Sequence, residues 1–284
     1  MTRTPPSRAV VLTALAMLAF AANSLLCRSA LRSTHIDPAT FTAVRLVSGA
    51  AVLAAIVAVR GRARLGGNWW SALALFCYAA GFSLAYVRLP AGVGALLLFG
   101  AVQVTMYAWG MRAGERVDAW QACGLLLAAC GLVALVLPGL SAPPLGSAAL
   151  MLGAGIAWGV YSLRGKGVGN PAATTAGNFV RSVPMALVLV LALPGSREAD
   201  GAGLTLAVAS GALASGVGYA LWYAALPSLR ATTAGIVQLS VPVIAAVGGV
   251  LLLAEPLSLR LVVSGLAVLG GIALALRNPA RTQS

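Results

Sequence analysis

The amino-acid sequence predicts an all-α polytopic membrane protein, in which ten transmembrane helices form two inverted five-helix repeats around a central cavity. Three observations support this: the composition is too apolar for water, ten apolar runs are long enough to cross a bilayer, and motifs of the first half recur in the second. Of the 284 residues, 60% are hydrophobic and 9% charged, whereas a soluble domain has about 25% charged and about 45–50% apolar residues. The polar side chains are too few to cover a globule of this size, so the soluble classes are excluded.

The ten spans follow from the apolar runs and from the turn residues between them. A helix needs about 20 mostly apolar residues to cross a hydrocarbon core of about 30 Å. The breaks carry Pro, Gly and Asn, as at Pro138-Gly139 and Asn170-Pro171, which favour turns. The expected spans are 9–31, 38–59, 69–88, 90–111, 118–138, 145–164, 171–193, 202–226, 231–253 and 258–277.

The positive charges predict the orientation of these spans. The formal net charge is +13, and the cations are scattered between apolar runs rather than clustered on a polar face, so we expect no nucleic-acid partner. With the N-terminus in the cytoplasm, twelve cations fall in inside segments and five in outside segments, and two lie within spans. The positive-inside rule therefore places both termini in the cytoplasm.

An internal repeat divides the spans into two units. Residues 115–132 match residues 255–272 at a constant offset of 140, and the Tyr, Leu and Pro around Pro90 recur around Pro227. These anchors predict repeats over 9–138 and 145–277. Five spans are an odd number, so the second repeat enters the membrane from the opposite side. Inverted repeats are typical of secondary transporters, which bind substrate near the midplane.

The same motifs resemble a known family. The two endings in which Glu115 and Glu255 precede a Gly-rich span, together with Asp37-Pro38 and Arg45, resemble the drug/metabolite transporter superfamily, and within it the ten-span branch with two EamA-type repeats. The chain looks most similar to bacterial inner-membrane exporters of amino acids, including aromatic ones, and of paraquat-like cations. The first helix of many such repeats has Trp-Gly, which Trp158-Gly159 matches.

The first repeat departs from that pattern, because Asn23-Ser24 stands where Trp-Gly is expected. The two halves of the cavity should therefore differ chemically. Small multidrug exporters of the same superfamily carry a membrane-embedded Glu in their first helix. Since this helix has Asn23 instead, the resemblance argues against proton coupling by that mechanism.

Candidate substrate-binding residues are the polar and aromatic side chains within spans, because lipid tails offer them no partner. Many recur every three or four residues, so they share one helical face. Such stripes also suit helix packing, and this alternative stays open. The candidates are Asn23, Tyr78, Phe82, Phe99, Gln103, Tyr107, Trp158, Tyr161, Tyr219, Trp222 and Gln238.

Two glutamines among them predict a shared polar site. At a rise of 1.5 Å per residue, Gln103 lies about 12 Å and Gln238 about 10 Å from the cytoplasmic face. They sit on corresponding helices of the two repeats, so their amides can hold an amino or carboxylate group together. The alternative is that each amide joins neighbouring helices by hydrogen bonds.

Further residues are candidates for gating or structural roles. Arg45 and Arg181 lie about 10 and 15 Å from the span entries; each can pair with a substrate carboxylate, or snorkel or cap backbone carbonyls. For Arg45 we expect a structural role. Arg181 is followed by Pro184, which leaves a broken helix open. The other candidates are the hinge prolines Pro90, Pro227 and Pro242 and the glutamates Glu115 and Glu255.

The positions of the acids, the histidine and the cysteines limit the functions that the chain can have. All six acids lie at or near span ends, the single histidine, His35, lies in an outside loop, and the four cysteines form no C-x-x-C pair. We therefore expect no enzyme, no metal and no cofactor. Facilitated transport fits this distribution better than proton coupling, although coupling to protons elsewhere in the chain stays open. The partners should be a small-molecule substrate and the lipid bilayer, and two complete repeats in one chain allow function as a monomer.

These features predict an inner-membrane exporter or facilitator of amino acids and related small metabolites, including aromatic ones, that works by alternating access. Two alternatives stay open. One is a multidrug or organic-cation exporter, because a cation can use the same aromatic rings. The other is a membrane assembly protein without transport.

Overall fold

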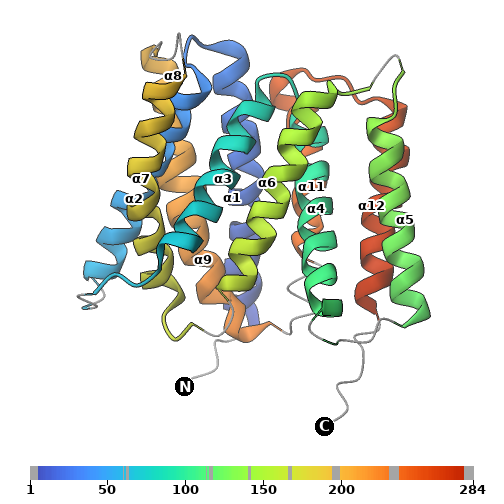
Figure 1. The fold of residues 1–284 in the computed structure, drawn as a ribbon, viewed down its shortest axis with the longest axis horizontal. Coiled ribbons are helices and arrows are strands. Elements are labelled where there is room, and N and C mark those ends of the chain that lie inside the picture. Colours follow the sequence, from blue (N-terminus) through green and yellow to red (C-terminus); the bar gives the residue numbers. More distant parts are fainter. Residues whose placement is uncertain are drawn as a thin grey trace.

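The computed structural model describes residues 6–59, 61, 64–112, 114, 118–139, 142–165, 168–193, 199–229 and 237–277. Within these residues every regular element is helical and no strand is present (Figure 1). Nine helices of the described part are long and apolar enough to cross a membrane, and Ser240–Leu253 is a shorter apolar helix. The predicted all-α polytopic fold is confirmed.

The helices agree with the expected spans to within a few residues. Most spans form a single helix, but the eighth joins two α-helical segments through a π-helix, η1, and ends in a 3-10 turn, η2. Residues 230–236, at the start of the expected ninth span, lie outside the described residues. The elements are α1 (Pro6–Ser33), α2 (Pro38–Val59), α3 (Trp69–Tyr86), α4 (Ala91–Arg112), α5 (Ala119–Val136), α6 (Leu145–Arg164), α7 (Pro171–Ala192), α8 (Gly201–Ala209), η1 (Ser210–Val217), α9 (Gly218–Ala225), η2 (Leu226–Ser228), α11 (Ser240–Leu253) and α12 (Leu259–Arg277).

Short polar side chains fix where several helices begin. Asn68, Asn170 and Asp200 each accept a hydrogen bond from a backbone N–H in the first turn of α3, α7 and α8. Asp118 and Gln121 form a reciprocal capping box at the start of α5. These bonds satisfy N–H groups that have no partner within the helix, so each span starts at a defined residue.

The bundle has two ends, which we call upper and lower as drawn in Figure 1. The lower end is where α1 begins and α12 ends, and the upper end is where α1 ends and α2 begins. α2 packs on α7, and α5 packs on α12. In the first pair of corresponding contacts, α3 packs on α6 as α9 packs on α1; in the second, α4 packs on α6 as α11 packs on α1. This is the pairing expected when each helix of the first repeat corresponds to the helix five spans later with inverted direction.

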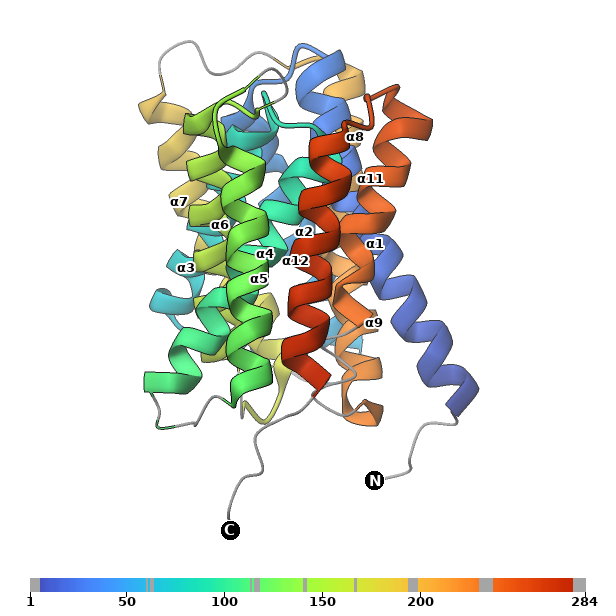
Figure 2. The same cartoon turned by 90° about the vertical axis from the view of Figure 1, so that its right-hand side faces the viewer.

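The α5–α12 pair stands at one edge of the bundle and faces the viewer in Figure 2. A Cβ atom built on Gly124 would lie 2.4 Å from the carbonyl oxygen of Gly271, and one on Gly271 would lie 2.5 Å from that of Gly124. The two backbones therefore touch, as small residues permit in membrane helix pairs. Leu126 and Leu266 are exposed on the same pair, where lipid would cover them.

Two prolines lie within expected spans, and one of them accompanies an interruption of its helix. Val237 and Gln238 are helical, the chain turns at Leu239, and Pro242 is the third residue of α11, so the ninth span is interrupted just before Pro242. A proline removes a helical hydrogen bond and disturbs the turn before it; that Pro242 serves as a hinge stays a prediction. Pro184 leaves α7 unbroken from Pro171 to Ala192, so the structure answers the question of a broken helix at Arg181 in the negative.

Candidate functional site

A cavity of about 660 Å³ extends from the middle of the bundle to the lower end. At its mouth lie the exposed residues Arg164 and Gly165, which end α6, and Pro171, which begins α7. Leu226 and Leu276, near the lower ends of α9 and α12, also line it. Small-molecule sites commonly measure about 300–1,000 Å³, so the main cavity has the size of a metabolite site.

A second, smaller cavity of about 30 Å³ continues the first toward the upper end. The two share the lining residues Phe20, Trp158, Tyr219 and Gln238, and we call the smaller one the deep cavity. Its volume is two to three times the roughly 10–15 Å³ that one water needs. It therefore has room for a small polar group but not for an aromatic ring.

All eleven predicted substrate-binding residues line one or both cavities. They come from α1, α3, α4, α6, α9 and the residue before the turn into α11, so both repeats contribute. That these residues bind a substrate stays a prediction. Asn23, Tyr78, Phe82 and Phe99 line the deep cavity, Gln103, Tyr107, Tyr161 and Trp222 line the main cavity, and Trp158, Tyr219 and Gln238 line both.

Aromatic rings centred on Trp158 form much of the wall. The Trp158 ring centroid lies 4.9 Å from that of Tyr78, 5.3 Å from that of Tyr161 and 5.4 Å from that of Tyr219. Aromatic pairs at such distances contribute about 0.5–1.5 kcal/mol beyond their area burial. The rings thus pack helices together while turning part of their surface to the cavity. A role in helix packing and a role in substrate binding are therefore compatible for these aromatic residues.

The predicted glutamine pair faces one space. Gln103 on α4 is buried, and Gln238 is the last helical residue before the turn at Leu239; both line the main cavity. Transporter sites often use interrupted helices in this way, because the interruption brings polar groups to the midplane. Amides supply both donors and acceptors, so this pair suits a substrate that carries both.

Sequence reasoning missed the contribution of α7. Thr174, Thr175 and Asn178 line the main cavity. Thr175 Oγ1 donates to Tyr223 Oη at 3.2 Å, and Asn178 Nδ2 donates to Tyr161 Oη at 3.5 Å. The sequence does contain a signal for this face. Asn178 follows Thr174 by four positions and Thr175 by three, and residues at these spacings on an apolar span share a helix face. They were overlooked because no aromatic ring repeats with them.

A buried polar chain lies behind the deep cavity. Arg45 Nη2 donates to Tyr78 Oη at 3.0 Å, and Asn23 Nδ2 donates to the same oxygen at 3.4 Å. Ser210 Oγ, at the start of the π-helix η1, donates to Asn23 Oδ1 at 2.6 Å. Wide π-helical turns often occur at functional sites. This chain joins α1, α2 and α3 of the first repeat to η1 of the second.

Arg181 has a different environment. Its Nη1 donates to the carbonyl oxygens of Gly66, in the loop before α3, at 2.7 Å and of Gly177 at 2.9 Å. Arg181 is absent from the described lining of both cavities. Of the two interpretations of this residue, the structure favours carbonyl capping.

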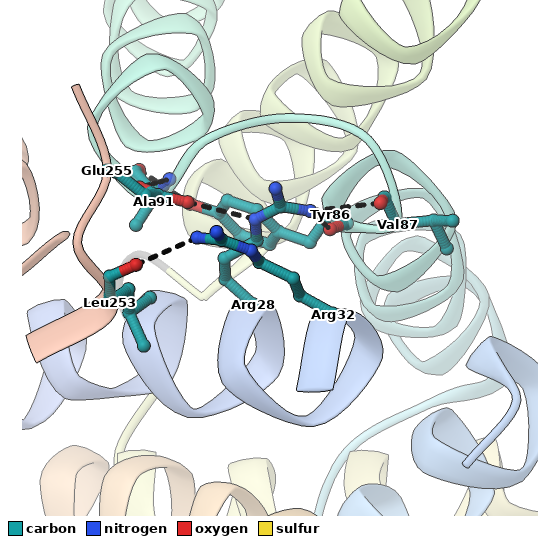
Figure 3. Close-up of polar contacts among 7 residues, drawn as sticks. All are labelled: Arg28, Arg32, Tyr86, Val87, Ala91, Leu253 and Glu255. Carbon is teal, nitrogen blue, oxygen red and sulfur yellow. Dashed lines mark hydrogen bonds and ion pairs between the residues drawn. The ribbon is translucent and has the colours of Figure 1, made fainter. Parts of the chain in front are cut away.

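The upper end is held by an ion pair between the repeats (Figure 3). Arg28 Nε lies 2.9 Å from Glu255 Oε1, and both side chains are largely buried, at 12% and 6% exposure. Glu255 Oε2 accepts a hydrogen bond of 2.7 Å from the backbone N–H of Ala91. Arg28 Nη1 also donates to the carbonyl oxygens of Tyr86 and Val87, at 2.9 Å each.

This network closes the upper end. It ties α1, the α3–α4 turn that contains Pro90, and the end of α11, and none of its residues lines either cavity. Just below it, Tyr86 is fully buried and contacts Phe82 edge-on at 4.6 Å. Glu255 lies within this network, and its gating or structural role stays a prediction, whereas Glu115 lies outside the described residues. Pro227, the counterpart of Pro90, lies in η2 at the lower end.

Acidic groups are missing from the lining. Among the described residues that line the two cavities, none is Asp or Glu. The described part of the chain also brings together no group of three or more His, Cys, Asp or Glu side chains that could hold a metal ion. The chemistry of the described cavity lining is therefore that of rings, amides, hydroxyls and one arginine, Arg164.

Comparison with known proteins gives matches along the whole chain. Residues 7–137 and 145–277 each match the EamA-like transporter family. An uncharacterized protein of Pseudomonas aeruginosa is 58% identical over 276 residues, 96% of each chain. An uncharacterized transporter of Archaeoglobus fulgidus is 29% identical over 208 residues, covering 71% of this chain and 73% of its own. A crystal structure with 20% identity has a TM-score of 0.69, covering 99% of this chain and 100% of its own, and shows the likeness of the fold. The resemblance drawn from the sequence is confirmed at the level of the family.

Proposed function

Because this chain belongs to the EamA-like transporter family, it is a membrane transporter, and we propose that it exports amino acids and related small metabolites, aromatic ones included, across the bacterial inner membrane. The observation that carries the proposal is the main cavity, which both repeats build and which reaches one end of the bundle. A transporter that alternates its access needs such a central site between its repeats.

The lining supports the substrate class. Trp158, Tyr161 and Tyr219 offer ring faces for an aromatic or apolar side chain. Gln103 and Gln238 offer donors and acceptors for an amino acid's polar groups. A volume of about 660 Å³ leaves room for such a molecule with water around it.

The direction of transport follows from the charge distribution. The positive-inside rule assigns the lower end to the cytoplasm, so the cavity takes substrate from there. Release on the other side requires the Arg28–Glu255 network to open while the lower end closes, with rotation at the turns that contain Pro90 and Pro227. No carboxylate faces the described cavity lining, so facilitated transport down the substrate gradient is the mode we propose.

The test is transport in proteoliposomes with radiolabelled phenylalanine, threonine and methyl viologen. We expect uptake of the two amino acids, with phenylalanine preferred. Met106→Trp places a ring in the cavity and should block uptake, whereas Leu126→Trp places the same ring on the exposed surface of α5 and should not. Uptake of methyl viologen alone would indicate an organic-cation exporter, and no uptake of any probe would indicate an assembly protein.

A further inference from the structure

Arg45 is a buried cation without an acidic partner. Its side chain is 2% exposed, and Nε and Nη1 make no hydrogen bond. The guanidinium carbon lies 4.8 Å from the ring centroid of Phe82 and 5.2 Å from that of Tyr78, and within the described residues no carboxylate bonds to it. Ring faces offset only part of the several kcal/mol, in order of magnitude, that burying an ion costs. A charge that is buried within the membrane without an acidic partner suggests that it serves a functional partner such as a substrate.

Tyr78 connects that charge to the deep cavity. Its hydroxyl accepts hydrogen bonds from Arg45 and from Asn23, and Tyr78 lines the deep cavity. A tyrosine hydroxyl has one proton to donate; with its oxygen engaged by two donors, that proton is left for another acceptor. The bond from a guanidinium polarises the O–H group and strengthens it as a donor.

The fixed charges around the pathway have one sign. Arg164 stands at the mouth of the main cavity, Arg45 lies behind the deep cavity, and the described lining contains no acid. In a site of low dielectric constant such an arrangement favours anions and repels cations. An ammonium group would find neutral oxygens and ring faces here, but no counter-ion.

We infer that the substrate is recognised by a carboxylate that enters the deep cavity, where Tyr78 donates to it and the charge of Arg45 stabilises it. The deep cavity, at about 30 Å³, accommodates a carboxylate, while the rest of the molecule stacks on Trp158 in the main cavity. The inference rests on the proposed function and narrows its substrates. The transported substrates then include aromatic carboxylates without an amino group, in addition to amino acids. Aromatic amines without a carboxylate are not transported.

Arg45 acts through Tyr78 and is therefore a positioning residue. A merely structural Arg45 would affect the transport of every substrate equally, so the informative quantity is the preference between probes. Arg181→Gln is the matched control, because Arg181 is the other arginine deep within a span and lies outside the described cavity lining.

Three probes with the same ring separate the groups: phenylalanine, phenyllactate, in which a hydroxyl replaces the amine, and phenethylamine, which lacks the carboxylate. Uptake into proteoliposomes is measured for wild type, Arg45→Gln, Arg45→Lys, Tyr78→Phe and Arg181→Gln. Wild type and Arg181→Gln should transport phenylalanine and phenyllactate at least tenfold faster than phenethylamine. Arg45→Gln should lose that preference, Arg45→Lys should keep it at a lower rate, and Tyr78→Phe should reduce it.

Binding gives a second measurement, independent of transport and of any loss of folding in one variant. Phenyllactate should raise the Tm of the wild-type protein in detergent and of Arg45→Lys, should raise that of Tyr78→Phe less, and should not raise that of Arg45→Gln. Phenethylamine transported as fast as phenyllactate would overturn the inference, as would an Arg45→Gln variant in which all probes slow equally. If phenylalanine is not transported, the proposed function fails, and the Tm shifts still decide whether the carboxylate site exists.

Discussion

The two ends of the bundle are built from corresponding elements of inverted repeats, yet they are in opposite states. At the upper end Arg28 and Glu255 form a buried pair that joins α1, the start of α4 and the end of α11. At the lower end Arg164 is exposed, donates to Ser71 at 3.1 Å and Asn68 at 3.2 Å, and borders the mouth of the main cavity. The comparison teaches that the closed upper end contains a buried ion pair between the repeats, whereas the arginine at the open lower end is exposed and bonds to neutral groups.

The largest effect is expected from breaking the closed end with Glu255→Ala. It leaves the Arg28 guanidinium without its carboxylate and the Ala91 N–H without its acceptor. Removing one partner of a buried ion pair costs about 3–5 kcal/mol, so the upper end should open. The measurement is labelling of Ser24→Cys, in the deep cavity, by an impermeant maleimide added outside cells whose protein lacks the four native cysteines.

Labelling should rise at least tenfold in Glu255→Ala. The control is Arg32→Ala, which removes an exposed bond to the carbonyl oxygen of Leu253 at the same end and should leave labelling unchanged. Equal labelling of all three proteins would show that the ion pair does not hold the upper end closed.

A smaller effect should follow from Trp158→Ala, which removes the ring on which the substrate is proposed to stack. Stacking on one ring contributes about 0.5–1.5 kcal/mol beyond the burial of apolar area, and about 1.4 kcal/mol changes affinity tenfold. The apparent affinity for phenylalanine should therefore fall roughly tenfold or more, and that for threonine much less. Trp158→Phe should retain most of the affinity. Equal losses for both amino acids, measured as KM in proteoliposomes, would contradict a stacking role.

The glutamine pair should give a still smaller change. A neutral hydrogen bond contributes about 0.5–1.5 kcal/mol, so Gln103→Ala and Gln238→Ala should each raise KM by roughly two- to twelvefold. Gln121→Ala, which removes a buried amide from the capping box of α5, should lower the Tm instead and leave KM unchanged. If both cavity variants transport normally, the shared amide site is wrong.

The smallest effect concerns Asp200, which caps α8 at the upper end. Its carboxylate accepts a 2.8 Å hydrogen bond from the N–H of Gly203, and this bond lowers the pKa of Asp200 below its usual 3.8. A lowered pKa in the folded state means that the stabilisation is present above pH 3.8 and is lost as the pH falls below it. Wild type should thus lose slightly more Tm between pH 7 and pH 3 than Asp200→Asn, which caps without titrating. An equal loss in both would show that the cap does not titrate.

The sequence predicted the helices because length, apolarity and the turn residues between the spans are local properties. Asn68, Asp118 and Asn170 each mark a helix start that can be read within a few residues. The repeat then predicted which faces meet, since inverted copies must share a central site. For that reason Gln103 and Gln238, far apart in sequence, were expected around one space.

The upper network could not be predicted in the same way. Arg28 and Glu255 are separated by 227 positions, and which residues meet at such a separation depends on the packing of whole helices. The position of the turn at Leu239 could not be predicted either, because a proline in an apolar run is compatible with either a kink or a helix start. That Nε and Nη1 of Arg45 have no hydrogen-bond partner likewise appears only once the neighbours of this side chain are known.

The described lining of the cavities, which lies beside Arg45 and contains no acid, bears on the energy source for export. A carboxylate that crosses without an ammonium group carries a net negative charge, and each elementary charge moved through 100 mV changes the free energy by about 2.3 kcal/mol. In the proposed orientation the cytoplasm is the negative side, so the membrane potential itself drives such anions outward. At 100 mV this is equivalent to a concentration ratio of about fiftyfold, whereas a zwitterion moves only down its own gradient.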